Sequence, residues 1–127
     1  MIPIIIIILY LLVHWVADFI TQTDKQAKNK STSIKWLLKH TLTYGLIITL
    51  FTYILYLFNY FGAQYWYLPL IFGLIQFVTH TLVDYITSKV NSSLWKNSQV
   101  HNFFVMIGFD QFIHYVILFS SLTLLFY

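Results

Sequence analysis

Four apolar runs, each long enough to cross a bilayer, restrict what this sequence can fold into. The hydrocarbon core of a membrane takes about 20 helical residues to span. The runs extend from about Ile2 to Ile20, from Ile34 to Phe61, from Trp66 to Val90 and from Asn102 to Phe126. A soluble helical bundle would need polar outer faces, which these runs lack. We therefore expect one all-α membrane domain with four transmembrane helices.

The positions of the basic residues predict how these helices are oriented. All of them are lysines, and they lie in or beside the first and third connections: Lys25, Lys28, Lys30, Lys35, Lys39, Lys89 and Lys96. The second connection and both ends of the chain have none. The positive-inside rule predicts lysine-rich loops in the cytoplasm and both termini outside, in an inner (cytoplasmic) membrane. The net charge of +3 then needs no nucleic-acid partner, and membrane lipid is the expected partner.

A His-x-x-x-Asp motif occurs in the first run, as HWVADFITQ from His14, and in the third run, as HTLVDYITS from His80. Residues four apart share a helix face, so each copy places an imidazole next to a carboxylate. The fourth run repeats the spacing in reverse order, and it resembles the second run more weakly. These matches predict two parallel-repeat helical hairpins, residues 1–61 and 66–127, related by an axis along the membrane normal.

Seven ionisable side chains are expected at one depth, in the cytoplasmic half of the membrane. Each helix rises about 1.5 Å per residue, which brings them to similar heights. An isolated charge at that depth would cost several kcal/mol, so the side chains should face one interior cluster. They are His14, Asp18, His40, His80, Asp84, Asp110 and His114. His101 and Asp24 lie in the connections and are expected to be solvated.

The residue types in this cluster are typical of a metal site. Neutral His and ionised Asp are ligands for Zn, Mn and Fe, and seven candidates are too many for one tetrahedral ion. We therefore expect one or two divalent ions, which would lower the pKa of a bound water for hydrolysis. The chain has no Cys, so thiolate ligands are excluded.

Other polar residues are expected to assist the cluster. Asp110 has no counterpart in the second run and should bridge the ions or act as a general base. Gln111, rotated by about 100° on the helix, should contact substrate. Gln22 should also bond to ligands or substrate, and Gln76, one turn before His80, is expected to be the hydrogen-bond partner of that histidine.

The order of these motifs resembles a family of small bacterial and phage membrane proteins known as domain of unknown function 3307. The pattern is H-x-x-x-D-F-x-x-Q, a lysine-rich loop with a later His, H-x-x-x-D-[FY], and D-Q-x-x-H. It is carried by His14, Asp18, Phe19, Gln22, His40, His80, Asp84, Tyr85, Asp110, Gln111 and His114. The family implies no activity. A more distant similarity to membrane-bound metal-dependent hydrolases implies metal-dependent hydrolysis.

Three interpretations of function follow. The first is an integral membrane metal-dependent hydrolase that acts at the cytoplasmic leaflet on a phosphorylated or lipid-linked substrate. The second is a transporter or proton relay, which should have ionisable groups at both membrane faces. Here the outer halves of the helices carry none apart from Tyr. The third is a small phage-type membrane effector in which the polar cluster is only structural.

Overall fold

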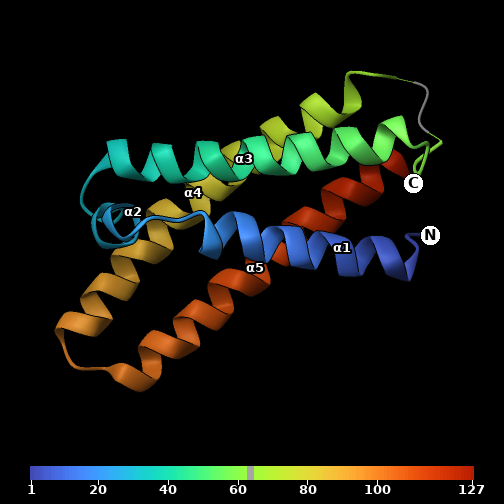
Figure 1. Cartoon of the computed structure of the whole chain (residues 1–127). Helices are drawn as coiled ribbons and strands as arrows, with labels where there is room; N and C mark the ends of the chain where they lie inside the picture. The colour runs from blue at the N-terminus through green and yellow to red at the C-terminus, as the bar shows by residue number, and fades with distance from the viewer. Residues whose placement is uncertain (63–64) are drawn as a thin grey trace.

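The computed structural model describes residues 1–62 and 65–127, and within these ranges it contains helices and no strand. The all-α prediction is therefore confirmed for the described chain (Figure 1). Residues 63–64, in the predicted second connection, lie outside the described residues. The elements are α1 (Ile4–Trp15), the π-helical turn η1 (Val16–Ile20), α2 (Asp24–Asn29), α3 (Ile34–Leu57), α4 (Leu68–Lys96) and α5 (Val100–Phe126).

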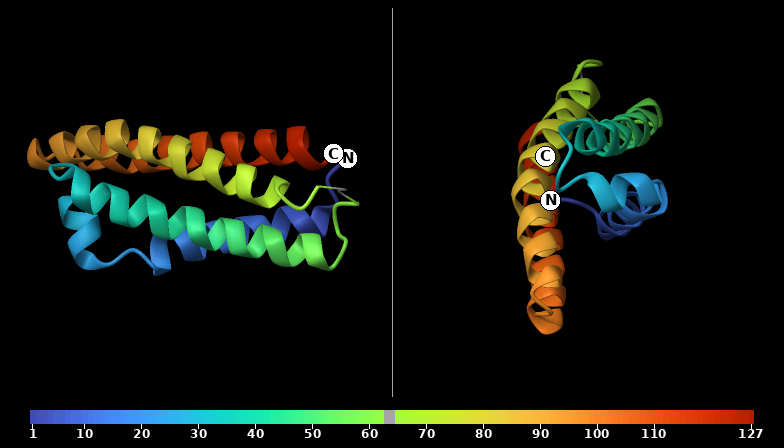
Figure 2. Two further views of the ribbon diagram at one scale, coloured as in Figure 1. Left: turned by 90° about the horizontal axis from the view of Figure 1, so that it is seen from above. Right: turned by 90° about the vertical axis from the view of Figure 1, so that its left-hand side faces the viewer.

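The long helices form two layers (Figure 2). One layer is the antiparallel pair α4 and α5, and the other contains α1 and α3; α3 packs against α4 and joins the layers. Both termini lie at one end of the molecule, together with the end of α3 (Figure 1). The opposite end holds α2 and the connection between α4 and α5, which lies away from α1 and α3 because the two layers cross obliquely.

In the described part of the chain, three helices are long and apolar enough to cross a membrane: α3, α4 and α5. The first predicted span corresponds to a shorter apolar helix, Ile4–Ile20. The third apolar run ends near Val90, but α4 continues to Lys96 through part of the predicted third connection. No Gly or Pro interrupts the segment from Asn91 to Lys96, so the polar residues there extend the helix beyond the apolar run.

Two glycines allow α3 and α4 to approach closely. A Cβ at Gly45 of α3 would lie 2.9 Å from the Cβ of Phe77, and one at Gly73 of α4 would overlap the hydroxyl of Thr49. Small residues are the usual means by which membrane helices bring their backbones together. The contact fixes α3 against α4 at a level between the cluster and the termini.

A layer of apolar side chains closes the bundle on the terminal side of the histidines. Each member is fully buried and lies about two helical turns from a clustered histidine on its own helix. The members are Ile6, Ile48, Phe72 and Leu122. The polar cluster is thus separated from the end of the molecule that holds the termini.

The first helix changes geometry where the cluster begins. In η1 the backbone N–H of Thr21 donates to the carbonyl of Val16 at 3.0 Å, which is the five-residue spacing of a π-helix. Such wide turns are frequent at functional sites, because the extra residue re-aims the side chains that follow. Here the turn buries Ala17 and the carboxylate of Asp18.

The predicted lysine-rich loop contains a short helix, α2. Its start is held by a capping box, in which the Thr23 hydroxyl accepts from the N–H of Gln26 and the Gln26 side chain accepts from the N–H of Thr23. The helix ends at Asn29 with Lys30 as its C-cap, and the side chain of Lys30 reaches Asp84 in the cluster.

Candidate metal centre

The seven side chains that were expected to cluster lie together where the helices meet. All but Asp110 are at least 96% buried. The shortest contacts join different helices: Asp18 to His40 at 3.1 Å and Asp84 to His114 at 3.2 Å. Within the sequence motifs, the His14–Asp18 and His80–Asp84 distances are 3.7 Å. Packing between the helices therefore sets the distances within the cluster. The four-residue spacing only places a histidine and an aspartate on the same face of one helix.

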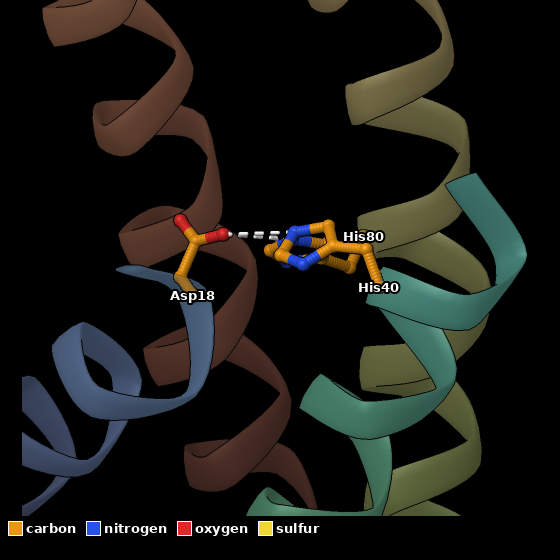
Figure 3. A group of neighbouring side chains, drawn as sticks. All are labelled: Asp18, His40 and His80. Atoms are coloured by element: carbon orange, nitrogen blue, oxygen red, sulfur yellow. Dashed lines mark hydrogen bonds and ion pairs between the residues drawn. The ribbon is translucent and has the colours of Figure 1, made fainter. Parts of the chain in front are cut away.

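Three atoms from three elements form a nearly equilateral triangle (Figure 3). Asp18 Oδ1 lies 3.1 Å from His40 Nε2 and 3.3 Å from His80 Nε2, and the two nitrogens are 3.3 Å apart. In a tetrahedral zinc site with bonds of 2.0–2.1 Å, neighbouring ligand atoms are about 3.3 Å apart. The triangle therefore matches one face of such a site and could hold an ion with little movement of the side chains.

A second set of potential ligands shares one member with the first. His80, Asp84 and His114 also offer ligand atoms that lie within 4.8 Å of one another. His80 Nε2 approaches both Asp18 Oδ1 and Asp84 Oδ1, and a single nitrogen coordinates one ion. Two ions could not both use it, so one ion fits this arrangement more simply than two.

Gln111 and His14 hold the carboxylate of Asp18 in place. The amide of Gln111 donates to Asp18 Oδ2 at 2.8 Å, and its carbonyl oxygen accepts from His14 Nε2 at 2.9 Å. His14 Nδ1 then accepts from the Tyr44 hydroxyl at 2.9 Å. Both ring nitrogens of His14 are thus hydrogen-bonded, and the residue lies next to the two sets of potential ligands. Tyr44, which the sequence analysis did not identify, lies one turn after His40, and that spacing is the signal that could have found it.

The ring of His80 is held by stacking. It lies between the rings of Tyr44 and His114, with centroids 3.9 and 4.0 Å away. Its Nδ1 has no hydrogen-bond partner among the described residues. The prediction that Gln76 bonds to His80 is wrong, because the amide of Gln76 donates to the Ser121 hydroxyl at 2.8 Å. Helical side chains tilt toward the N-terminus, so Gln76, which precedes His80, extends away from it.

Lys30 is the functional candidate that sequence reasoning missed. Its ammonium lies 2.8 Å from Asp84 Oδ2, and its side chain is 20% exposed. Burial lowers the pKa of Lys30, but the carboxylates of Asp84 and Asp18 outweigh it and hold that pKa above its usual value. Nothing in the sequence distinguishes Lys30 from the lysines around it, because the capping of α2 and the fold together select it.

Two further residues lie at the edge of the cluster. Asp110 accepts from the Thr87 hydroxyl at 2.6 Å and from the amide of Gln111 at 3.2 Å, and lies 3.5 Å from His114. Gln22 places its amide 3.3 Å from the ring nitrogens of His40. Asp24 and His101, which were expected to be solvated, are exposed.

A pocket of about 610 Å³ opens beside the cluster, so the site is accessible from one side. Its wall includes Asp18, Gln22, Asp110 and Gln111. Three carboxylates, Asp18, Asp84 and Asp110, face four histidines and the one ammonium of Lys30 in the cluster. Charge inside a membrane must be compensated, and a divalent cation would supply positive charge beside the carboxylates.

The comparisons with known proteins agree with the motif pattern. No curated protein and no solved structure matches the chain, so the resemblance to metal-dependent hydrolases stays a prediction. Residues 6–126 match the family described as "Protein of unknown function (DUF3307)". This range includes all the clustered side chains and nearly the whole chain. The protein therefore belongs to the DUF3307 family.

Proposed function

We propose that this protein is an integral membrane hydrolase that uses a divalent transition metal ion, Zn, Mn or Fe, bound in the His/Asp cluster. The observation that carries the proposal is the triangle of Asp18, His40 and His80, whose edges match those of a tetrahedral site. The three carboxylates of the cluster, which need positive charge beside them inside a membrane, also support it. The substrate is a phosphorylated or lipid-linked molecule, reached through the adjoining pocket.

We also propose the membrane arrangement that the lysines predict. The chain crosses the membrane four times, as two repeated hairpins, with both termini outside and the cluster in the cytoplasmic half. Two observations support this arrangement. The termini lie at one end of the molecule, and α2, which carries Lys25 and Lys28, lies at the other (Figure 1). At 17 residues, Ile4–Ile20 is close to the shortest length that spans a bilayer.

The bound ion and Asp110 have different roles in the proposed reaction. When bound, the ion would polarise a water molecule and stabilise negative charge on the substrate. Asp110 lies outside both ligand sets but faces the pocket, which suits a general base. It takes a proton from the water as the oxygen attacks phosphorus. The bond from phosphorus to the alcohol oxygen then breaks, and the alcohol recovers the proton. The products are inorganic phosphate and the alcohol.

The apolar layer argues against a proton relay. A relay needs polar groups or water from one membrane face to the other. Between the cluster and the termini stand Ile6, Ile48, Phe72 and Leu122, each 0% exposed. Among the described residues, the cluster opens toward the pocket, as expected of an enzyme that acts on one leaflet.

The metal site is tested by comparing two histidine variants of the protein purified in detergent. We expect His80→Gln to lose the bound metal, as measured by elemental analysis. His101→Gln, which changes an exposed histidine outside the cluster, should retain it. Because a ligand at a hundred times its Kd stabilises a protein by about 2.7 kcal/mol, a chelator should lower the Tm of wild type and of His101→Gln by several degrees. A wild type that binds no metal and melts alike with and without chelator would leave the structural-cluster interpretation.

The reaction is tested with Asp110→Asn, which removes the proposed base and leaves the five ligand candidates intact. We expect this variant to retain metal and to lose at least about a hundredfold in phosphate release, the usual contribution of general base catalysis. Full turnover in Asp110→Asn, or no metal-dependent turnover by wild type on any phosphorylated lipid, would contradict the mechanism.

A further inference from the structure

The pocket beside the cluster has a wall of mixed polar and apolar composition. Its lining comes from η1, from α2 and from the parts of α4 and α5 near their connection. At about 610 Å³ it falls within the range of sites for small organic ligands. One part of its wall is basic and polar and another is aromatic, so the pocket suits a molecule with a charged head and an apolar tail.

The basic part of the wall comes from two elements. Lys28 and Lys30 reach the pocket from α2 and its end, and Lys96 reaches it from the last turn of α4. Lys30 is engaged with Asp84, whereas Lys28 and Lys96 are exposed. Three ammonium groups around one pocket attract an anion, and a phosphate monoester carries about two negative charges near neutral pH.

Two polar side chains in the pocket wall have no protein partner. Within the described residues, Ser88 Oγ and Asn91 Oδ1 are buried without a hydrogen bond. Ser88 is 9% exposed. On the same helix the hydroxyl of Thr79 donates to the carbonyl four residues earlier, and that of Ser88 does not. A buried polar group without a partner is costly, and a polar head in the pocket would supply the missing partner.

The aromatic part of the wall lies along the adjoining ends of α4 and α5. It comprises the aromatic side chains of Trp95, Phe103 and Phe104, with the aliphatic Ile107 beside them. The rings of Trp95 and Phe103 are 5.1 Å apart and join the two helices, and Phe104 is 63% exposed. An apolar surface beside a basic one, on a protein that faces lipid, matches the boundary between a headgroup and its acyl chain.

We propose that this pocket binds a membrane lipid with a phosphate monoester head, of the phosphatidic acid type, and presents it to the cluster. This inference rests on the proposed function, for which it names the substrate class. The phosphate lies among the lysines, Ser88 and Asn91, and the start of the acyl chain lies on the aromatic wall. Asp18, Asp110 and Gln111 belong to both the pocket and the cluster, so the head is held next to the proposed site of reaction.

Lipid binding by the detergent-purified protein tests the pocket independently of turnover. Native mass spectrometry would compare phosphatidic acid, phosphatidylcholine and inorganic phosphate, each with zinc and with chelator. We expect phosphatidic acid to bind most tightly, and Lys96→Gln to weaken it about fivefold. Lys89→Gln, an exposed lysine on the same helix that lies outside this pocket, is the matched control. Phe104→Ala should also weaken binding, and Phe109→Ala, an exposed phenylalanine of α5 outside the pocket, should not.

The outcomes separate this inference from the proposed function. Binding that needs Lys96 and Phe104 supports the pocket even where no hydrolysis is found. Phosphatidic acid that binds no better than phosphatidylcholine, or equally well in all four variants, overturns the pocket even where soluble phosphate esters are hydrolysed. Inorganic phosphate that competes at the same concentration as phosphatidic acid also overturns it, because the apolar wall would then contribute nothing.

Discussion

The two central carboxylates each use their oxygens for different partners. Asp18 turns Oδ1 toward His40 and His80, and its Oδ2 accepts from Gln111. Asp84 turns Oδ1 toward His114, and its Oδ2 accepts from the ammonium of Lys30. Oδ2 of each group is therefore held by a partner other than histidine, although Asp84 Oδ2 also lies 3.4 Å from His40 Nε2 and Asp18 Oδ2 lies 3.7 Å from His14 Nε2. Such support is what holds a metal ligand in position before an ion binds.

Lys30 places a positive charge where a metal ion would also be attracted, and the two should compete. We predict that Lys30→Gln raises the affinity for zinc about tenfold. A hydrogen bond to a charged group is worth about 1.5–3 kcal/mol, and in this variant the ion would not have to compete with the bond between Lys30 and Asp84. Titration against a chromophoric chelator measures this affinity.

The control for this prediction is Lys25→Gln, an exposed lysine of the same helix. It should change zinc affinity less than twofold, since exposed charges are screened by solvent. Weaker zinc binding by Lys30→Gln would mean that the ammonium organises the carboxylates and does not oppose the ion.

At the scale of the elements, the sequence predicted which side chains lie together in the cluster but not how each is oriented. The His-x-x-x-Asp motifs and the lysine distribution were enough to place His14, His80 and Asp84 at one level. The π-helical turn that includes Asp18 was not predicted, because no residue in Val16–Ile20 marks such a turn in the sequence. Direct contacts such as that of Lys30 with Asp84 depend on the whole fold.

Two other features, the start of α2 and the end of α4, could have been predicted from the sequence but were not. The spacing of Thr23 and Gln26 is a capping-box signature, and it marks the start of α2. The polar end of α4 was interpreted as a connection because it leaves the apolar run, although residues 91–96 contain no helix breaker. The length of a membrane span and the length of its helix are different quantities, and hydropathy reports only the first.

The contact of α3 with α4 should be sensitive to a single methyl group. We predict that Gly73→Ala destabilises the protein by about 1–3 kcal/mol, the usual cost of overpacking. The new Cβ would lie 2.8 Å from the Cβ of Thr49 as well as against its hydroxyl, so rotation of that side chain cannot relieve the overlap. Thermal unfolding in detergent measures the loss.

Gly108→Ala is the matched control, since a Cβ there meets nothing within 4 Å. It should stabilise α5 by about 0.5–1 kcal/mol, because alanine loses less backbone entropy than glycine in a helix. Equal effects at Gly73 and Gly108 would contradict close packing between α3 and α4.

The whole molecule has two unlike ends. The end with α2 holds the pocket, the lysines and the open side of the cluster. Toward the other end, the core is apolar and includes the ring contact of Phe61 with Phe126. Under the proposed function, the reactive groups are exposed to one leaflet only, so the orientation of the protein in the membrane decides which lipids it can meet.

That orientation can be measured with single cysteines, because the natural chain has none and each variant carries one reactive site. We predict that Asn59→Cys and Ile2→Cys react with a membrane-impermeant maleimide added outside intact cells. Lys28→Cys and Asn97→Cys should react only after the membrane is opened. The physical reason is the energetic cost of moving lysine-rich loops across the membrane.

Ile2→Cys decides whether the short helix Ile4–Ile20 spans the membrane. If it spans, the N-terminus and the end of α3 lie on the same side of the membrane, because both lie at one end of the molecule (Figure 1). Labelling of Ile2→Cys only after permeabilisation, with Asn59→Cys still labelled from outside, would leave three spans and an N-terminal helix that does not cross. Labelling of Asn59→Cys only from the cytoplasm would reverse the orientation and place the pocket in the outer leaflet.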